Sequence, residues 1–130
     1  MTYDLHILRV DPGHSAYVAL EDLVRLQDEP QWPSELTQEH LDIWDRIVRR
    51  VRGTNGPVTE DVFRAYAELS LRAPRIRLYY CADHATVRIP YWYSGEAALD
   101  ALRCGYGIAR IVAEETGFVA VDSVLRKLLP

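Results

Sequence analysis

Histidines and cysteines are the side chains of this 130-residue chain that could bind a metal ion or act as a nucleophile and its base. The four histidines are His6, His14, His40 and His84. No two of them have the His-x-x-x-His or His-x-His spacing that places two ligands on one metal ion, so we predict no metal site. Cys81 precedes His84 by three residues. Nucleophilic catalysis needs contact between the two side chains and an oriented base, and this spacing alone does not predict them.

Glycines and paired carboxylates are the other features that could indicate a reactive site. Gly105-Tyr106-Gly107 contains the first part of a phosphate-binding glycine pattern, but no strand precedes it and the third glycine is missing. We interpret these glycines as a place where a helix packs closely on a sheet. Paired acids such as Glu114-Glu115 fall on a charged helix face, where solvation explains them. The sequence therefore predicts no catalytic residues and no cofactor.

Acidic residues are concentrated in the first third of the chain. The net charge of -4 argues against a general nucleic-acid-binding protein, which needs positive charge to displace counterions. Residues 1–45 carry ten acidic residues and two arginines, whereas residues 46–93 carry four acidic residues and nine arginines. Six acids on one loop and the start of one helix form either an ordinary solvated face or a negative patch that attracts a cationic protein partner. They are Asp28, Glu29, Glu35, Glu39, Asp42 and Asp45.

A second candidate surface combines arginines with aromatic residues. Alternation along a predicted hairpin places five such residues on one face: Arg75, Arg77, Tyr79, Arg88 and Trp92. Arg, Tyr and Trp are enriched among the residues that dominate binding energy at protein interfaces. The same types occur in RNA-stacking sheets, but the sequence has no RRM signature and its net charge is negative. Alternatively, helices cover the aromatic positions and the arginines pair with the acidic segment.

The elements that must position these residues follow from the spacing of apolar side chains. Alternation over residues 3–10 predicts a first strand, and helical periodicity predicts helices over 15–27 and 35–52. Ser34 or Thr37 is expected to cap the helix over 35–52. On its surface, two aspartates each precede an arginine by four residues, which predicts two ion pairs: Asp42 with Arg46, and Asp45 with Arg49.

The rest of the chain predicts a further helix and then a change to strand periodicity. A short helix is expected between Thr59 and Pro74, with four residues facing inward: Val62, Phe63, Tyr66 and Leu69. We then expect an antiparallel hairpin over 75–93, the longest helix over 95–116 ending at Gly117, a strand over 118–121 and a helical turn over 123–129. Because Pro90 cannot donate to a strand ladder, the second hairpin strand is expected to lie at an edge or to end there.

This order of elements predicts one α+β domain over residues 1–130. We expect a small, mainly antiparallel sheet of about four strands, packed on a single layer of helices on one face. Two cysteines, Cys81 and Cys104, are too few for a disulfide framework, so we expect free thiols in a reducing compartment. The sequence has no signal-peptide pattern at its start and no apolar run of ~18 residues, which predicts a cytoplasmic protein that does not enter a membrane.

Three stretches of the chain resemble a loose group of small, mostly uncharacterised bacterial α+β proteins. They are Thr2-Tyr3-Asp4-Leu5, Ile89-Pro90-Tyr91-Trp92 and residues 111–122, which run from a helix through Gly117 into a strand. Where the group closes on Tyr-Asp-Pro-Gln, this chain has Val121-Asp122-Ser123-Val124. Several small acidic α+β proteins of similar outline are immunity proteins that neutralise bacterial toxins. The resemblance therefore implies such a protein, and it carries no catalytic residues.

We thus expect a non-enzymatic protein-binding domain, an immunity-type inhibitor that binds a cationic toxin domain through its acidic residues or its arginine-aromatic hairpin. One alternative is a small-molecule-binding or enzymatic domain with a pocket between the long helix and the hairpin, lined by Tyr79, Tyr91, Trp92 and Tyr106. Another alternative is a structural protein that self-associates through the strand that contains Pro90.

Overall fold

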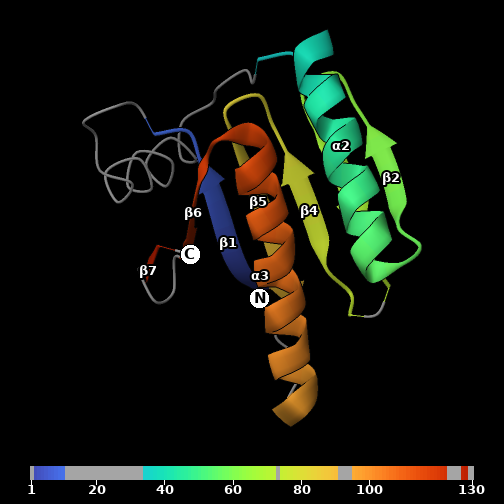
Figure 1. Ribbon diagram of the computed structural model, residues 1–130, viewed down its shortest axis with the longest axis vertical. Coiled ribbons are helices and arrows are strands. Elements are labelled where there is room, and N and C mark those ends of the chain that lie inside the picture. Colours follow the sequence, from blue (N-terminus) through green and yellow to red (C-terminus); the bar gives the residue numbers. More distant parts are fainter. Residues whose placement is uncertain (1, 11–33, 73, 91–94, 123–126, 129–130) are drawn as a thin grey trace.

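The computed structural model describes residues 2–10, 34–72, 74–90, 95–122 and 127–128 (Figure 1). These residues form an α+β fold, as expected, with two helices, α2 (Gln38–Asn55) and α3 (Gly95–Thr116), and one antiparallel sheet. The strands are β1 (Thr2–Leu8), β2 (Thr59–Val62), β3 (Ala67–Ser70), β4 (Arg77–Tyr80), β5 (His84–Pro90), β6 (Val119–Asp122) and the two-residue β7 (Lys127–Leu128). The expected number of about four strands is therefore too low.

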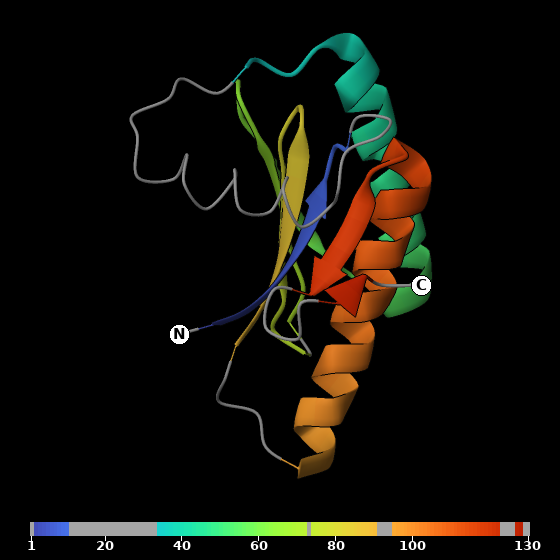
Figure 2. The same cartoon turned by 90° about the vertical axis from the view of Figure 1, so that its left-hand side faces the viewer.

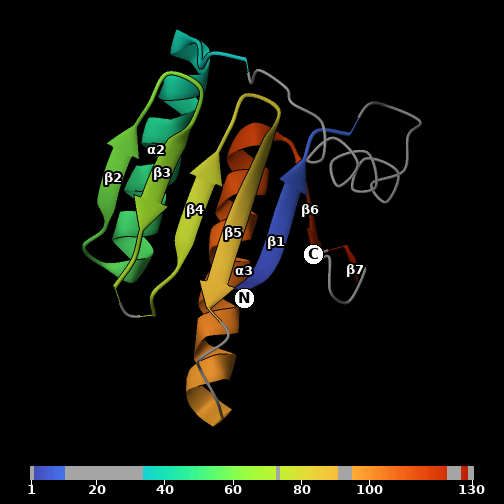
Figure 3. The same ribbon diagram turned by 180° about the vertical axis from the view of Figure 1, so that it is seen from behind.

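The sheet is larger than expected because both ends of the chain and a second hairpin add strands to it. Its order is β2-β3-β4-β5-β1-β6-β7, and every neighbouring pair is antiparallel (Figure 3). The strands from β2 to β5 follow one another along the chain. The N-terminal strand β1 lies between β5 and β6, so the sheet brings together the two ends of the described chain.

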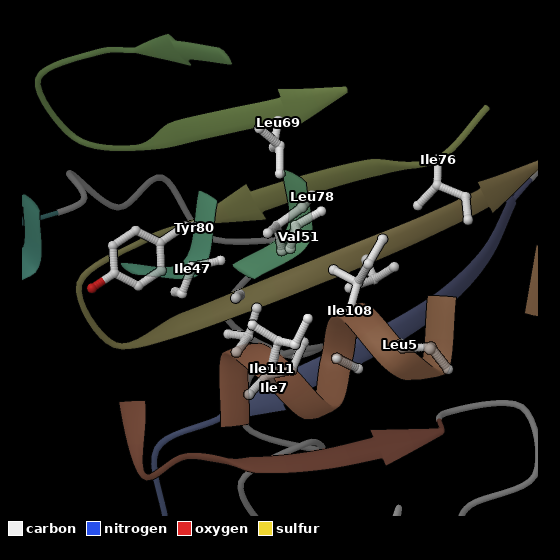
Figure 4. Packing of buried hydrophobic residues seen from close by; sticks show 14 of the residues in the cluster. Leu5, Ile7, Ile47, Val51, Leu69, Ile76, Leu78, Tyr80, Ile108 and Ile111 are labelled. Carbon is white, nitrogen blue, oxygen red and sulfur yellow. The ribbon is translucent and has the colours of Figure 1, made fainter. Parts of the chain in front are cut away.

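Both described helices pack on the same face of the sheet (Figure 2). The core between them and the sheet contains Trp44, Ile47 and Val51 of α2 with Ile108 and Val112 of α3, all at most 1% exposed. Apolar strand residues pack against them from the sheet, among them Leu5, Ile7, Leu69 and Leu78 (Figure 4). The face turned away from α2 and α3 is called the far face below.

Local sequence signals explain where the two helices begin and end. Thr37 caps α2, because its hydroxyl oxygen accepts a hydrogen bond from the His40 backbone N–H at 3.3 Å, and His40 Nδ1 accepts one in return from the Thr37 backbone N–H at 2.9 Å. Gly117 follows α3 with a φ of 77°, in the left-handed region that glycine adopts without strain. The bounds predicted for α3 are thus confirmed, whereas α2 begins and ends three residues later than the predicted 35–52 and continues through Gly53.

The prediction of a helix between Thr59 and Pro74 is wrong, because this segment forms the β2–β3 hairpin. Ala67, Leu69 and Leu71 are buried, whereas the alternate residues Glu68 and Ser70 are only partly buried, which is the period of a strand. The apolar residues also fit a helical spacing, which explains the error. Tertiary pairing with β4 over Ala67 to Ser70 decides between the two structures.

Three other predictions can be compared with the described residues. Strand β5 ends at Pro90 and lies between β4 and β1, so it is not an edge strand. Lys127–Leu128 form β7 rather than part of a helical turn, whereas residues 123–126 and the helix expected over 15–27 lie outside the described residues. Gly105 confirms close packing of α3 on the sheet, because a Cβ there would overlap the side chain of Ile89.

Candidate functional site

Four acidic residues of the predicted negative patch lie at the start of α2. They are Glu35, Glu39, Asp42 and Asp45, all exposed, and together they are called the acidic end of α2. Asp28 and Glu29 lie outside the described residues. From Arg46 onward, α2 carries the opposite charge on four arginines: Arg46, Arg49, Arg50 and Arg52. The helix is therefore negative before Arg46 and positive from Arg46 to its end.

Two of the four arginines of α2 pair with α3 and not with the acidic end of α2. Arg46 Nε lies 3.1 Å from Glu115 Oε2, and Arg50 lies 2.8 Å from Glu114 Oε2. The expected pair of Asp42 with Arg46 is wrong, because the arginine reaches across to the neighbouring helix. Asp45 and Arg49 form no ion pair within the described part of the chain either. The acidic end of α2 thus keeps carboxylates that these arginines do not neutralise.

The tip of the β2–β3 hairpin lies against the start of α2 (Figure 3). The Leu36 backbone N–H donates to the Arg64 carbonyl oxygen at 2.9 Å, and Arg64 Nε lies 3.3 Å from Glu35 Oε1. At this tip three large apolar side chains are exposed: Val62 at 49%, Phe63 at 46% and Tyr66 at 36%. The rings of Phe63 and Tyr66 stack with centroids 4.6 Å apart. Side chains alternate along a strand, so these two rings project on the far face, whereas Val62, opposite buried Ala67, projects on the helix side. The two rings are called the hairpin-tip patch.

Sequence reasoning missed the hairpin-tip patch because it placed the same residues inside a helix. The turn that connects the strands consists of Arg64 and Ala65, closed by a hydrogen bond of 2.8 Å from Phe63 N to Tyr66 O. This two-residue turn has no Gly, Asn or Asp, which are the usual signals of a tight hairpin. A usable signal was the density of strand-forming Val, Phe and Tyr residues beside it.

The predicted arginine-aromatic surface lies on the far face, away from the acidic end of α2. Arg77 pairs with Arg88 in the β4–β5 register, so these residues and Tyr79 share one face, as the alternation predicted. Arg77 lies 3.8 Å from Glu68, and Arg88 lies 3.6 Å from Asp4 and 5.2 Å from the centre of the Tyr79 ring. The far face is therefore balanced in charge around these arginines.

Arg75 and Trp92 are the other two members of the predicted arginine-aromatic surface. Arg75 is exposed just before β4, and it too has an interaction within the structure. Trp92 lies outside the described residues. The alternative that the arginines pair with the acidic N-terminal segment is confirmed for Arg88, which lies near Asp4, and is wrong for Arg77, which lies near Glu68 of β3.

A buried carboxylate at the end of β6 is a feature that sequence reasoning missed. Asp122 is 0% exposed, and its Oδ2 accepts hydrogen bonds from the hydroxyls of Tyr3 on β1 and Tyr106 on α3. Burial, followed by the hydrogen bond to Asp122, raises the pKa of both tyrosines, so both stay protonated donors at neutral pH. The cluster joins β1, β6 and α3 and leaves the Asp122 carboxylate away from solvent.

The aromatic pocket of the alternative hypothesis is wrong for the residues that the structure describes. Tyr79 lies on the far face, whereas Tyr106 lies on the helix side of the sheet, and Tyr91 and Trp92 lie outside the described residues. A cavity of about 400 Å³ lies instead where α2 ends and β2 begins. Its lining has a single ionisable side chain, Arg72, among Asn55, Pro57, Val58, Thr59, Ser70 and Leu71. This lining offers no acid and base pair.

The described residues contain neither a metal-binding cluster nor a membrane-spanning helix. No group of three or more His, Cys, Asp or Glu side chains among them is arranged to hold a metal ion. Neither described helix is long and apolar enough to span a bilayer. Comparison with protein-family models, with curated proteins and with solved structures gives no match. The function is therefore inferred from the surfaces described above.

Proposed function

We propose that this chain is a non-enzymatic protein-binding domain, an immunity-type inhibitor of the bacterial cytoplasm that binds a cationic toxin domain. The observation that carries the proposal is that the hairpin-tip patch and the acidic end of α2 are both exposed at the same end of the molecule. The hydrogen bond from Leu36 to Arg64 and the ion pair of Arg64 with Glu35 hold the hairpin turn against the start of α2, and the two rings project beside this turn on the far face. An exposed apolar patch beside polar residues is typical of a protein-interaction site.

The chemistry of the hairpin-tip patch suits an anchor in a protein interface. Phe63 and Tyr66 stack on each other, so their rings are held in place before a partner arrives. A preordered aromatic pair loses little side-chain entropy on binding, and aromatic anchors at the centre of an interface provide much of its affinity. The two rings would contact an apolar pocket of the partner.

The charge of the neighbouring helix supports a cationic partner. Glu39 and Asp45 have no ion-pair partner among the described residues, and Asp42 accepts one hydrogen bond, from Gln38 at 2.9 Å. A cluster of like charges on one surface speeds the approach of an oppositely charged protein and selects against acidic ones. The arginine-aromatic surface supports the proposal less, because Arg77 and Arg88 already lie near Glu68 and Asp4.

The proposal is tested by a pull-down of the chain with the product of the gene adjacent to its own. The experiment is run at about 0.1 M and about 1 M salt, where the Debye length is ~10 Å and ~3 Å. We expect a complex at the lower salt concentration that weakens at the higher one. Absence of a complex at the lower salt concentration would contradict the proposal, and a complex that salt does not affect would contradict the role of the acidic end of α2.

A further inference from the structure

The end of the β4–β5 hairpin brings a cysteine and a histidine together on the far face. The Cys81 backbone N–H donates to the His84 carbonyl oxygen at 2.8 Å, so the two residues lie directly opposite each other. The adjacent pair, Tyr80 and Ala85, is buried on the helix side. Side chains alternate along a strand, so those of Cys81 and His84 project together on the other side. Directly opposed residues of an antiparallel pair have Cβ atoms ~5 Å apart.

Asp83 holds the imidazole ring of His84 in place. Asp83 Oδ1 lies 2.8 Å from His84 Nδ1, which leaves the second ring nitrogen, Nε2, for another partner. Hydrogen bonds to Asp83 and then to Cys81 raise the pKa of His84 to about 10. The ring is therefore a cation at neutral pH. Its side chain is 30% exposed, so a small reagent can approach this end of the hairpin.

The other ionisable groups around His84 do not remove the positive charge opposite Cys81. Arg9 follows β1, and its backbone N–H donates to the Asp83 carbonyl oxygen at 3.3 Å, which brings a further cation to the turn. His6 of β1 lies on the same face, and burial lowers its pKa, so it is uncharged at neutral pH. Asp83, the acid at this turn, is 72% exposed and is engaged with His84.

We propose that Cys81 is the reactive thiol of this chain and that it forms mixed disulfides with low-molecular-weight disulfides. A cation beside a cysteine favours the thiolate, which is the nucleophile in this chemistry. The Cys81 thiolate attacks one sulfur of the small disulfide, a new S–S bond forms, and the old one breaks. The second sulfur of the reagent leaves as a thiolate, and the proton that Cys81 gave up passes to solvent. No other oxidant is needed.

The second cysteine provides an internal comparison. Cys104 is partly buried on α3, and its S–H donates to Asn55 Oδ1 at 3.2 Å. Burial raises the pKa of the Cys104 thiol, because the charged thiolate is poorly solvated there. In the described residues, no histidine or arginine is paired with it. The structure thus contains one thiol opposite a cation and one thiol that burial keeps protonated.

The test measures the rate at which each thiol releases the coloured thiolate of 5,5′-dithiobis(2-nitrobenzoate) at pH 7, in the folded chain and in urea. The Cys104→Ser variant reports Cys81, and the Cys81→Ser variant reports Cys104. We expect Cys81 to react faster in the folded chain than in urea, and Cys104 to react more slowly in the folded chain. A Cys81 rate in the folded chain at or below its rate in urea would overturn the proposal.

The role of His84 is tested separately in the Cys104→Ser background. His84→Gln removes the cation, and we expect the Cys81 rate in the folded chain to fall by about tenfold or more. His84→Lys restores a positive charge opposite Cys81 and should recover part of the rate. Circular dichroism of each variant shows that it is folded. Equal rates for the Gln and Lys variants would overturn the role of His84. These thiol reactions are measured without any partner protein, so their results do not depend on the proposed toxin-binding function.

Discussion

Tyr106 of α3 donates its hydroxyl to the buried carboxylate of Asp122 at the end of β6, with 2.5 Å between the two oxygens. Tyr3 of β1 donates to the same carboxylate oxygen, so the N-terminal strand meets the consecutive elements α3 and β6 at one atom. A buried carboxylate costs free energy unless it is hydrogen-bonded. The position of α3 on the sheet therefore depends on these two tyrosine hydroxyls.

Replacing Tyr106 with Phe should destabilise the fold by removing one of these donors. Loss of a hydrogen bond to a buried carboxylate lowers the free energy of unfolding by about 1 to 3 kcal/mol. Urea denaturation of the Tyr106→Phe variant measures this change. Tyr66→Phe is the matched control, because it removes a hydroxyl from an exposed ring and should change the free energy of unfolding by less than about 0.5 kcal/mol. Equal effects of the two substitutions would contradict the role of Tyr106.

Two glycines of α3 should respond in opposite ways to alanine. A Cβ at Gly105 would overlap the Ile89 side chain, which is 4% exposed and has little space to move, whereas a Cβ at Gly107 would meet open space. Gly107→Ala should raise the free energy of unfolding by up to about 1 kcal/mol, because alanine favours the helix. Gly105→Ala should lower it by about 1 to 3 kcal/mol through overpacking. Thermal melting of both variants measures the difference, and stabilisation by both would show that α3 lies farther from the sheet.

His84 should make the fold less stable as the pH rises above neutrality. Its pKa is about 10 in the folded chain and near 6.5 when unfolded, so the fold binds a proton that the unfolded chain releases. The resulting stability is fully present below about pH 6.5 and is lost as the pH rises through about 10. Urea denaturation from pH 6 to pH 10 should show this loss in the original chain and a smaller one in His84→Gln. Identical slopes would contradict the coupling of His84 to Asp83.

His6 should have the opposite effect at lower pH. Burial lowers its pKa below 6.5 in the folded chain, so the unfolded chain binds the proton first. The stability that this histidine contributes is present above about pH 6.5 and is lost as the pH falls. A comparison of the original chain with His6→Gln between pH 7 and pH 5 measures the effect. We expect a steeper loss in the original chain, and a steeper loss in His6→Gln would show that His6 is not buried as described.

Elements with an unambiguous hydrophobic period could be predicted from the sequence. The apolar stripe of α2, the cap at Thr37, and the run of α3 to Gly117 each agree with a local rule, and the structure confirms them. The β2–β3 hairpin could not be predicted in this way, because its apolar spacing fits a helix as well and its turn has no glycine. Pairing with β4, which is a tertiary interaction, determines its structure.

The candidate sites were harder to predict because they depend on contacts between distant segments. The acidic end of α2 was found from sequence, since four of its predicted residues are close together in the chain. Sequence could not show that Arg46 turns away from Asp42 to reach Glu115, which lies 69 residues farther along the chain. The same holds for Asp122, whose partners come from β1 and α3. Tertiary proximity, and not local pattern, assembles these groups.

Binding to the partner tests the central claim most directly. The affinity for the adjacent gene's product is measured by calorimetry for the original chain and two double variants, after circular dichroism has shown that each is folded. Phe63→Ala with Tyr66→Ala removes the rings of the hairpin-tip patch, and Arg77→Ala with Arg88→Ala removes the arginines of the β4–β5 pair on the same face of the sheet. We expect the first pair to weaken binding at least tenfold, about 1.4 kcal/mol, and the second to change it little. Loss of binding in the arginine variant with full binding in the aromatic variant would contradict the proposed surface.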